Sequence, residues 1–504
     1  MPAFAHIPLG TPIPDVPHAV SCSLPTMAAV RGYEEKDPAV VGSLRSGYPR
    51  FLVHPFSRRL ASALAERHGL SGRTLWLASS RRMADALLAH LRGAGAAGAA
   101  LFESAGAHGV SHPQAPDTAQ RAKLYLQHVG GFISSREAED ILAAAGIGPA
   151  PAAEAYFRGD AAGEVRAVLR PLFAGAADAD LLLANSGMNA VYSAFRAVAE
   201  VQARRGRTAW VQLGWLYLDT IAILRKFTAA GADYIHLPDV MDRGALERLF
   251  ADRGPGIAGV VAEVPSNPLM QTPDVAALAS LCRANGARLI LDPSLASAFS
   301  VDCLPHADVV VNSLTKYTGS DGDIMAGLVA VNPASPDAGT LRREVAALVE
   351  PPYPRDLARL AAQIRNTQGV LSRIEESTPK VASFLGSHPA VRATYWALDP
   401  AARANYLRVA RSPGATGGMI SFTLRGRLED FYDRLRLPKG PSFGMRTTLI
   451  CPFMYLAHYD LVTSVAGRAE LARNGLDPDL LRLCVGTEPA GDIIGALDEA
   501  LRGA

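Results

Sequence analysis

Residues 180–350 alternate short apolar runs with helical patterns, and this alternation constrains the fold more than any other feature of the chain. The runs have the length of buried strands and lie at 180–184, 208–213, 233–237, 257–264, 288–292, 308–312 and 325–331. Helical patterns at 218–230 and 275–284 separate some of them. Strands that alternate with helices in this way predict an α/β fold, with a mostly parallel sheet covered on both faces.

The remaining sequence divides around this pattern. Residues 1–55 are punctuated by proline and glycine and predict an extended N-terminal arm. Residues 56–175 are rich in alanine with apolar residues three and four apart, which predicts a helix-rich region with short strands. Prolines near 351 are expected to separate a large domain at 176–350 from a smaller α+β domain at 351–504. A chain of 504 residues is long enough for two or three cores.

Composition argues against several classes of protein. The formal net charge is +2 and the basic residues are scattered, so no nucleic-acid partner is expected. No run of 18 apolar residues occurs, and residues 1–24 lack the basic and apolar regions of a signal peptide, so no membrane association is expected. The five cysteines lie far apart without a CxxC pair, which predicts a reducing compartment and no zinc ribbon. We therefore expect a cytoplasmic enzyme without a bound metal.

Two of the predicted strands end in residues with the chemistry of a catalytic site. The run at 288–292 ends at Asp292, and the run at 308–312 leads into Ser313-Leu314-Thr315-Lys316. Most lysines after strands are solvated loop residues, but here the lysine and the aspartate occur together. A lysine that forms a Schiff base and an aspartate that pairs with a pyridinium nitrogen are the groups that pyridoxal phosphate needs most. Ligands of such sheets lie outside the carboxyl ends of the strands, so the sequence predicts a pyridoxal phosphate site there.

Other strand ends and loops carry residues that suit the same cofactor. Ser186-Gly187-Met188 follows a strand and opens a helix, where backbone N–H groups and the helix dipole favour a phosphate. Alone, such a pair is more often a cap or a turn. Ser313 and Thr315 would add hydroxyl donors to the phosphate, or would cap the strand end.

Three further residues have a cofactor or substrate interpretation beside a structural one. Asn267 would donate to the phenolic oxygen of pyridoxal, or would form an Asn-Pro turn. Tyr217 would stack on the cofactor ring, although an aromatic residue after a strand more often packs in a core. Arg482 stands in an apolar strand pattern, where a buried guanidinium needs an anion. That anion is either a substrate carboxylate or a structural partner such as Glu488.

With these residues in place, the chain resembles the Cys/Met-metabolism family of fold type I pyridoxal-phosphate enzymes. That family includes cystathionine gamma-synthases, cystathionine lyases and O-acylhomoserine sulfhydrylases. The matching segments are Tyr48-Pro49-Arg50, Ser186-Gly187-Met188, 217–220, 263–268, Asp292, 313–316, 440–444 and 482–488. The N-terminal segments at 8–10, 14–19, 23–26 and 47–51, with 127–128, 133–136 and 456–459, resemble the long-form synthases known from fungi.

The resemblance implies a role for each suspected residue. Lys316 would hold the cofactor and transfer protons, Asp292 would keep the pyridine nitrogen protonated, and Tyr217 would stack on the ring. The remaining cofactor contacts would come from Ser186, Gly187, Met188, Asn267, Ser313 and Thr315.

The resemblance also implies an assembly and a way to hold the substrate. Tyr48 and Arg50 would reach the cofactor phosphate of a neighbouring subunit, which implies a homodimer or homotetramer. Arg482, with Ser442 near it, would bind the carboxylate of an amino-acid substrate.

Two departures from short members of the family concern the substrate. Ser320-Asp321-Gly322-Asp323 replaces their Gly-His-Ser-Asp after the lysine, and Thr447 stands where many carry a glutamate. The leading hypothesis is a transferase of transsulfuration and methionine biosynthesis, which replaces the acyl group of an O-acylhomoserine by cysteine to give cystathionine. The alternatives are an O-acylhomoserine sulfhydrylase, a cystathionine gamma-lyase, or a catalytically silent subunit that binds pyridoxal phosphate.

Overall fold

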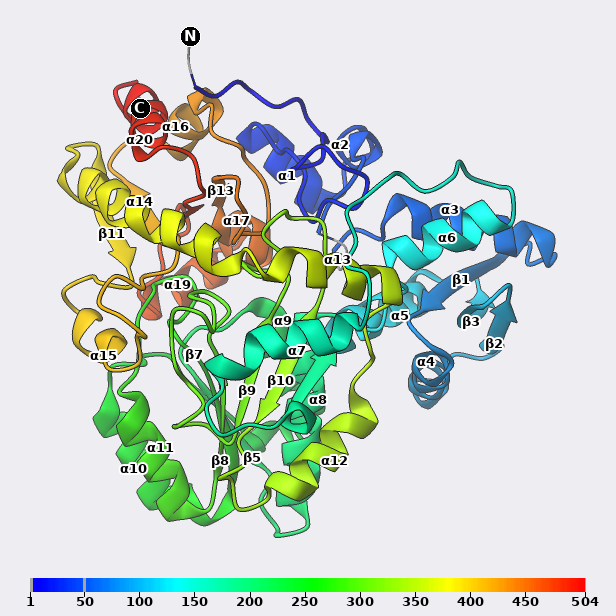
Figure 1. The fold of residues 1–504 in the computed structure, drawn as a ribbon, viewed down its shortest axis with the longest axis horizontal. Coiled ribbons are helices and arrows are strands. Elements are labelled where there is room, and N and C mark those ends of the chain that lie inside the picture. Colours follow the sequence, from blue (N-terminus) through cyan, green and yellow to red (C-terminus); the bar gives the residue numbers. More distant parts are fainter. Residues whose placement is uncertain (1–2, 49–50, 504) are drawn as a thin grey trace.

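A seven-stranded sheet forms the centre of the structure, a computed structural model that describes residues 3–48 and 51–503 (Figure 1). The strand order is β4-β10-β9-β8-β7-β5-β6. The bounds are β4 Leu181–Ala184, β5 Ala209–Leu213, β6 Tyr234–Leu237, β7 Ile257–Glu263, β8 Arg288–Asp292, β9 Val309–Ser313 and β10 Gly327–Val331. Strands β6, β5, β7, β8 and β9 run parallel, whereas β10 is antiparallel to both β9 and β4. The prediction of a mostly parallel α/β sheet is confirmed.

Helices cover both faces of this sheet, because successive strand residues point to opposite sides. Val309 and Val311 of β9 pack in one core, and Val310 between them packs in the other. The first core includes α8 Gly187–Ala203, α9 Leu218–Phe227 and α12 Ala338–Leu348. The second includes α7 Ala161–Leu169, α10 Arg243–Arg253, α11 Val275–Asn285 and α13 Pro354–Ile364. The two cores fix the sheet between them, and the carboxyl ends of its parallel strands lie together at one edge.

Residues 55–144 form a separate layer of helices around a small antiparallel sheet of order β1-β3-β2, at the right of Figure 1. The strands are β1 Arg73–Ala78, β2 Ala100–Ser104 and β3 Ala107–Pro113. The helices are α3 Pro55–Arg67, α4 Arg81–Gly93, α5 Pro116–Val129 and α6 Ser135–Ala144. The prediction of helices with short strands in this region agrees with these elements.

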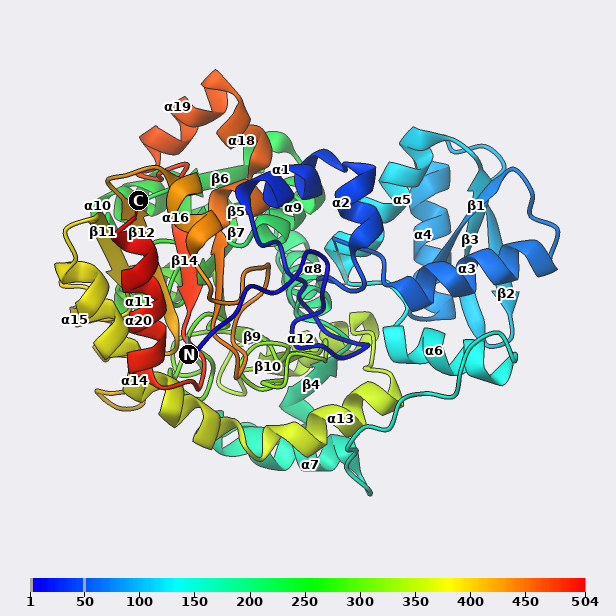
Figure 2. The same cartoon turned by 90° about the horizontal axis from the view of Figure 1, so that it is seen from above.

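The N-terminal segment is not extended throughout, contrary to the sequence-based expectation. It contains α1 Met27–Glu35 and α2 Pro38–Ser43. Thr26 caps α1 by accepting the Ala29 N–H, and Asp37 caps α2 ahead of Pro38. These caps begin helices that are too short to show clear periodicity. Figure 2 shows the segment running from the C-terminal elements toward α3.

A four-stranded antiparallel sheet of order β11-β12-β14-β13 lies in the C-terminal part. Its strands are β11 Val391–Trp396, β12 Met419–Leu424, β13 Leu449–Pro452 and β14 Leu481–Cys484. The helices of this part are α14 Thr367–Ser387, α15 Arg403–Leu407, α16 Leu428–Arg434, α17 Phe453–Ala457, α18 Tyr459–Thr463, α19 Val465–Arg473 and α20 Ala490–Leu501. The domain limits given above remain a prediction. Among residues 3–48 and 51–503, no helix is long and apolar enough to cross a membrane.

Candidate active site

A cavity at the carboxyl edge of the central sheet gathers most of the predicted site residues. Ten of them line it: Tyr48, Gly187, Met188, Tyr217, Asn267, Asp292, Ser313, Lys316, Ser442 and Arg482. They come from the ends of β8 and β9, from the first half of β14, from the starts of α8 and α9, and from loops that include the one after β7. Ser186 and Thr315 lie beside the cavity without lining it, and Arg50 lies outside the described residues.

The start of α8 offers a place for a phosphate. Ser186 caps the helix, because its Oγ accepts the Asn189 N–H at 3.1 Å. A Cβ atom on Gly187 would lie 2.8 Å from Cβ of Ser313, so only glycine allows the helix to start this close to β9. The free N–H groups of the first turn and the Ser313 hydroxyl therefore converge, and the helix dipole adds positive charge. This cradle fits the phosphate of pyridoxal phosphate.

Thr315 has a structural task in this arrangement. Its Oγ1 accepts the Ala326 N–H at 3.1 Å and lies 3.3 Å from the Ala326 carbonyl oxygen, so the side chain ties the Lys316 turn to the segment before β10. The role of Thr315 as a phosphate donor remains a prediction.

Lys316 is buried, with 5% of its surface exposed, and its amine points into the cavity. Nζ donates to Oγ of Ser442 at 2.6 Å and lies 4.4 Å from the centre of the Tyr48 ring of the same chain. The loop that carries Ser442 is pressed against the lysine, because a Cβ atom on Gly444 would lie 3.1 Å from Lys316 Cα. The expected contribution of Tyr48 to a neighbouring subunit remains a prediction.

Two carboxyl groups lie side by side at the end of the sheet. Glu263 of β7 pairs in register with Asp292 of β8. Burial raises the pKa of Asp292 to about 6, although its hydrogen bonds with Ser294 oppose the shift. Burial, reinforced by Asp292, raises the pKa of Glu263 well above its ordinary value. Asp292 is partly buried and has no ion-pair partner among the described residues, which fits the expected partner of a pyridinium nitrogen.

Glu263 also orders the neighbouring loops, a task that sequence reasoning missed. Its Oε1 accepts the backbone N–H of Tyr217 at 2.6 Å, and the backbone N–H of Asn267 faces the same carboxyl group. The signal in the sequence was an acidic residue ending an apolar run, which Glu263 shares with Asp292.

Arg482 of β14 is 7% exposed and faces the cavity. Its Nη1 donates to Oδ1 of Asn267 at 3.3 Å, and its guanidinium carbon lies 4.5 Å from the centre of the Phe453 ring. Glu488 is not its partner, because that carboxylate accepts hydrogen bonds from the Thr448 N–H and hydroxyl instead. No described carboxylate lies within 4.0 Å of Arg482, so the guanidinium is open to an anion in the cavity.

The wall of the cavity away from the sheet is apolar. It is lined by Phe51, Leu218, Pro441, Phe443, Phe453, Leu456 and Ala457. Thr447, which replaces the glutamate of many short family members, does not line it. Among the described lining residues, Asp292 and Glu263 are the only acids, and Lys316 and Arg482 are the only bases.

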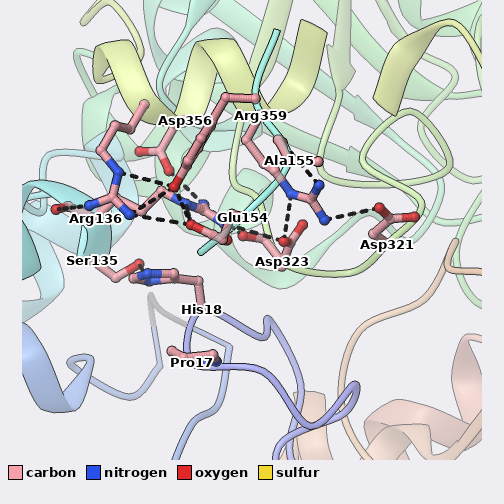
Figure 3. A network of polar contacts seen from close by, with 12 residues as sticks. Pro17, His18, Ser135, Arg136, Glu154, Ala155, Asp321, Asp323, Asp356 and Arg359 are labelled. Carbon is pink, nitrogen blue, oxygen red and sulfur yellow. Dashed lines mark hydrogen bonds and ion pairs between the residues drawn. The ribbon is translucent and has the colours of Figure 1, made fainter. Parts of the chain in front are cut away.

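A buried polar network joins the N-terminal half of the chain to the loops of this site (Figure 3). At its centre Arg136 of α6 is fully buried and pairs with Glu154, Asp323 and Asp356 at 2.5, 3.3 and 2.9 Å. Arg359 links Asp323 to Asp321.

The network reaches both loops that meet at Lys316. Asp321 also accepts from Nε of Arg446 at 2.8 Å. Asp321 and Asp323 follow Lys316 in the chain, and Arg446 follows Ser442. The network therefore fixes the lysine loop and the serine loop to one cluster.

A larger cavity, of about 610 Å³, lies between α3, β1, α6 and the segment around Tyr353. None of Lys316, Asp292, Ser442 and Arg482 lines it, so it is distinct from the cavity that gathers the predicted site residues. In the described part of the chain, no three His, Cys, Asp or Glu side chains are grouped to hold a metal ion.

The central sheet and the site at its carboxyl edge define a fold type I pyridoxal-phosphate enzyme. The family model described as "Cys/Met metabolism PLP-dependent enzyme" matches residues 166–502, and the chain belongs to this family. The prediction of the family and of its cofactor is confirmed.

Three known proteins show how the chain relates to the family. It is 40% identical, over 98% of both chains, to L-2-amino-4-chloropent-4-enoate dechlorinase/desaturase of Streptantibioticus cattleyicolor. It is 27% identical to cystathionine gamma-synthase of Neurospora crassa, over 100% of this chain and 99% of that protein. The crystal structure of cystathionine gamma synthase from Xanthomonas oryzae pv. oryzae in complex with cystathionine matches 68% of this chain and 86% of its own. Its TM-score is 0.58 and its identity 25%.

Proposed function

We propose that this enzyme removes a leaving group from Cγ of a small amino acid and releases an unsaturated product without adding a thiol. The charge distribution in the cavity carries this proposal. Of the described lining residues, the four charged ones are Lys316, Arg482, Asp292 and Glu263. These suffice for the cofactor and for the carboxylate of one amino acid. The other described lining residues include no charged group to hold the ammonium and carboxylate of a second amino acid such as cysteine.

The residues of the site divide the work of such a reaction. Arg482 offers two N–H groups to the substrate carboxylate, a geometry that fixes its orientation. Bound pyridoxal phosphate supplies the electron sink. The Lys316 amine takes and returns protons at carbon, and the Ser442 hydroxyl, 2.6 Å from it, holds the amine in place between transfers. The apolar wall offers no polar side chain, among the described residues, to hold water beside the reacting carbons.

The similarity to the Streptantibioticus enzyme supports a substrate with chloride as the leaving group. In L-2-amino-4-chloropent-4-enoate the chlorine is on C4, which is Cγ. The C–Cl bond breaks and chloride leaves, while a proton is lost from carbon. The product therefore has one more unsaturation than the substrate, and no oxidant is needed.

The sequence-based hypothesis, replacement by cysteine on an O-acylhomoserine, is the second candidate. The full-length similarity to the Neurospora synthase favours it. It shares the departure of a group from Cγ and differs only in the arrival of a thiol. The sulfhydrylase is a variant of the second candidate, with sulfide in place of cysteine. The γ-lyase is a variant of the first, because it eliminates a group without adding a thiol.

The test is a product analysis with the purified holoenzyme. L-2-amino-4-chloropent-4-enoate is supplied alone, and O-acetyl- and O-succinylhomoserine are supplied with and without cysteine or sulfide. We expect chloride release and a product lighter by the mass of HCl, with no dependence on thiol. Efficient formation of cystathionine with little chloride release would establish the second candidate. Lys316→Ala serves as the inactive control for every substrate.

A further inference from the structure

Glu263 is an acidic side chain enclosed at the inner end of the cofactor cavity. It ends β7, is 2% exposed, and has one carboxyl oxygen, Oε1, bonded to the Tyr217 N–H. The other oxygen, Oε2, has no hydrogen-bond partner among the described residues. A buried carboxyl oxygen without a partner is costly when the group is ionised.

The neighbours of Glu263 only partly offset a negative charge, because burial and Asp292 outweigh the backbone N–H groups and Arg482. Asp292 pairs with it in register from β8, so the two carboxyl groups point to the same face of the sheet. Two such groups in a buried site cannot both ionise cheaply. The cations that face them are Arg482 of β14 and Lys316 after β9, and neither forms an ion pair with Glu263 in the described chain. The remaining contacts are the backbone N–H groups of Tyr217 and Asn267.

We propose that Glu263 is a positioning residue that stays a neutral carboxylic acid, so that Asp292 alone carries negative charge toward the cofactor ring. In this state its carbonyl oxygen accepts the Tyr217 N–H and fixes the start of α9, where Tyr217 faces the cavity. The proton remains on Oε2, the oxygen without a partner. One uncharged group, the carboxylic acid of Glu263, then orients Tyr217, Asn267 and Asp292.

An ionised Glu263 that merely caps α9 is the competing explanation. A carboxylate at a helix N-terminus is favoured by the helix dipole, and the cap alone would require no proton. The two explanations predict opposite effects for Glu263→Gln, because glutamine keeps the accepting oxygen and the shape but can never be charged.

The first measurement is the unfolding equilibrium of the apoprotein between pH 5 and pH 8. Folding raises the pKa of Glu263, so the native state binds more protons than the unfolded state above about pH 4.5. Wild-type stability therefore falls as the pH rises toward the folded pKa, and Glu263→Gln escapes this loss. We expect the unfolding constant of the wild type, relative to the variant, to rise up to about tenfold per pH unit.

The second measurement is spectroscopic and uses a matched control. The infrared C=O band of a protonated carboxylic acid at pH 7 should be lost in Glu263→Gln. Glu350 is equally buried, at 1% exposure, but pairs with Arg82 at 2.5 Å, so Glu350→Gln should leave that band unchanged. Glu263→Gln should also bind pyridoxal phosphate within about threefold of the wild type, judged by absorbance titration.

The proposal is overturned if the band is the same in the wild type and in Glu263→Gln. It is equally overturned if the relative unfolding constant does not change with pH, or if the variant loses cofactor affinity by tenfold or more. Each of these results would favour the competing explanation, in which Glu263 is ionised and caps α9.

Discussion

Replacing Arg136 by methionine should loosen the contact between α6 and the body of the enzyme. Methionine keeps the apolar stem and removes the charge, while the buried Asp323 and Asp356 and the partly buried Glu154 remain around it. Breaking a buried ion pair by removing one partner costs about 3–5 kcal/mol. Here that cost falls on Asp356, because Asp323 keeps Arg359 and Glu154 keeps Arg355 as partners.

The pKa of Glu154 gives an independent scale for this cost. Burial pushes that pKa upward, yet the hydrogen bonds and charge of Arg136 lower it to about 2 from 4.5. At about 1.4 kcal/mol per unit this corresponds to about 3 kcal/mol, before a discount for the solvent-facing part of Glu154. The stabilisation is present above about pH 4.5 and is lost as the pH falls toward 2, so the effect of the substitution should shrink in acid.

Hydrogen–deuterium exchange of the α6 and α13 amides measures this loss locally. A cost of 3–5 kcal/mol corresponds to exchange that is faster by roughly two to three and a half orders of magnitude, if these helices open as a unit. Arg170→Met is the control, since Arg170 forms an exposed pair with Asp178 at 3.5 Å and should have little effect. Unchanged protection of α6 in Arg136→Met at pH 7 would refute the reasoning.

Four further outcomes are expected. Borohydride should attach the cofactor irreversibly to Lys316, as seen by peptide mass spectrometry, and a label on another lysine would contradict the site. Arg482→Ala and Arg482→Lys should weaken amino-acid binding by about 3–5 kcal/mol in spectrophotometric titrations and leave cofactor affinity unchanged; normal binding with a lower melting temperature would favour a structural role. Mixing Arg50→Ala with Lys316→Ala should restore activity through hybrid dimers, whereas a fully active monomer by light scattering would exclude shared sites. Asp292→Asn should stabilise the apoprotein above pH 6 by up to about 3 kcal/mol in denaturant titrations. The raised pKa of Asp292 lowers the free energy of unfolding at any pH at which this carboxyl group is ionised in the unfolded chain, and asparagine removes that loss. Equal stability of both proteins would contradict this.

The sequence could predict what depends on local pattern. Apolar runs of strand length predicted all seven strands of the central sheet within one or two residues at either end. Asp292 and Lys316 were found together because parallel strands bring their carboxyl ends to one edge. The direction of β10 could not be predicted, since an apolar run reads the same in a parallel and an antiparallel strand.

Contacts between distant segments could not be predicted either. Arg136 reads as an ordinary helix-surface arginine, and its burial depends on Asp323, 187 residues away. Glu263 was noticed only as part of a matching segment, because its environment depends on the register between β7 and β8. In both cases the chemistry follows from packing partners that no local pattern identifies.

The network around Arg136 limits how this enzyme can be recombined with its relatives. Arg136 and Glu154 precede residue 166, where the family match begins, yet Arg136 holds the loop just beyond Lys316 through Asp323. A chimera that fused the matched segment to the N-terminal part of a short family member would keep every residue that the family shares. It would also bury Asp356 without Arg136, its ion-pair partner among the described residues, and leave Asp323 with Arg359 as its arginine partner. Grafting the matched segment onto another scaffold therefore requires either co-transfer of α6 with residue 154 or a neutral substitute for Asp356.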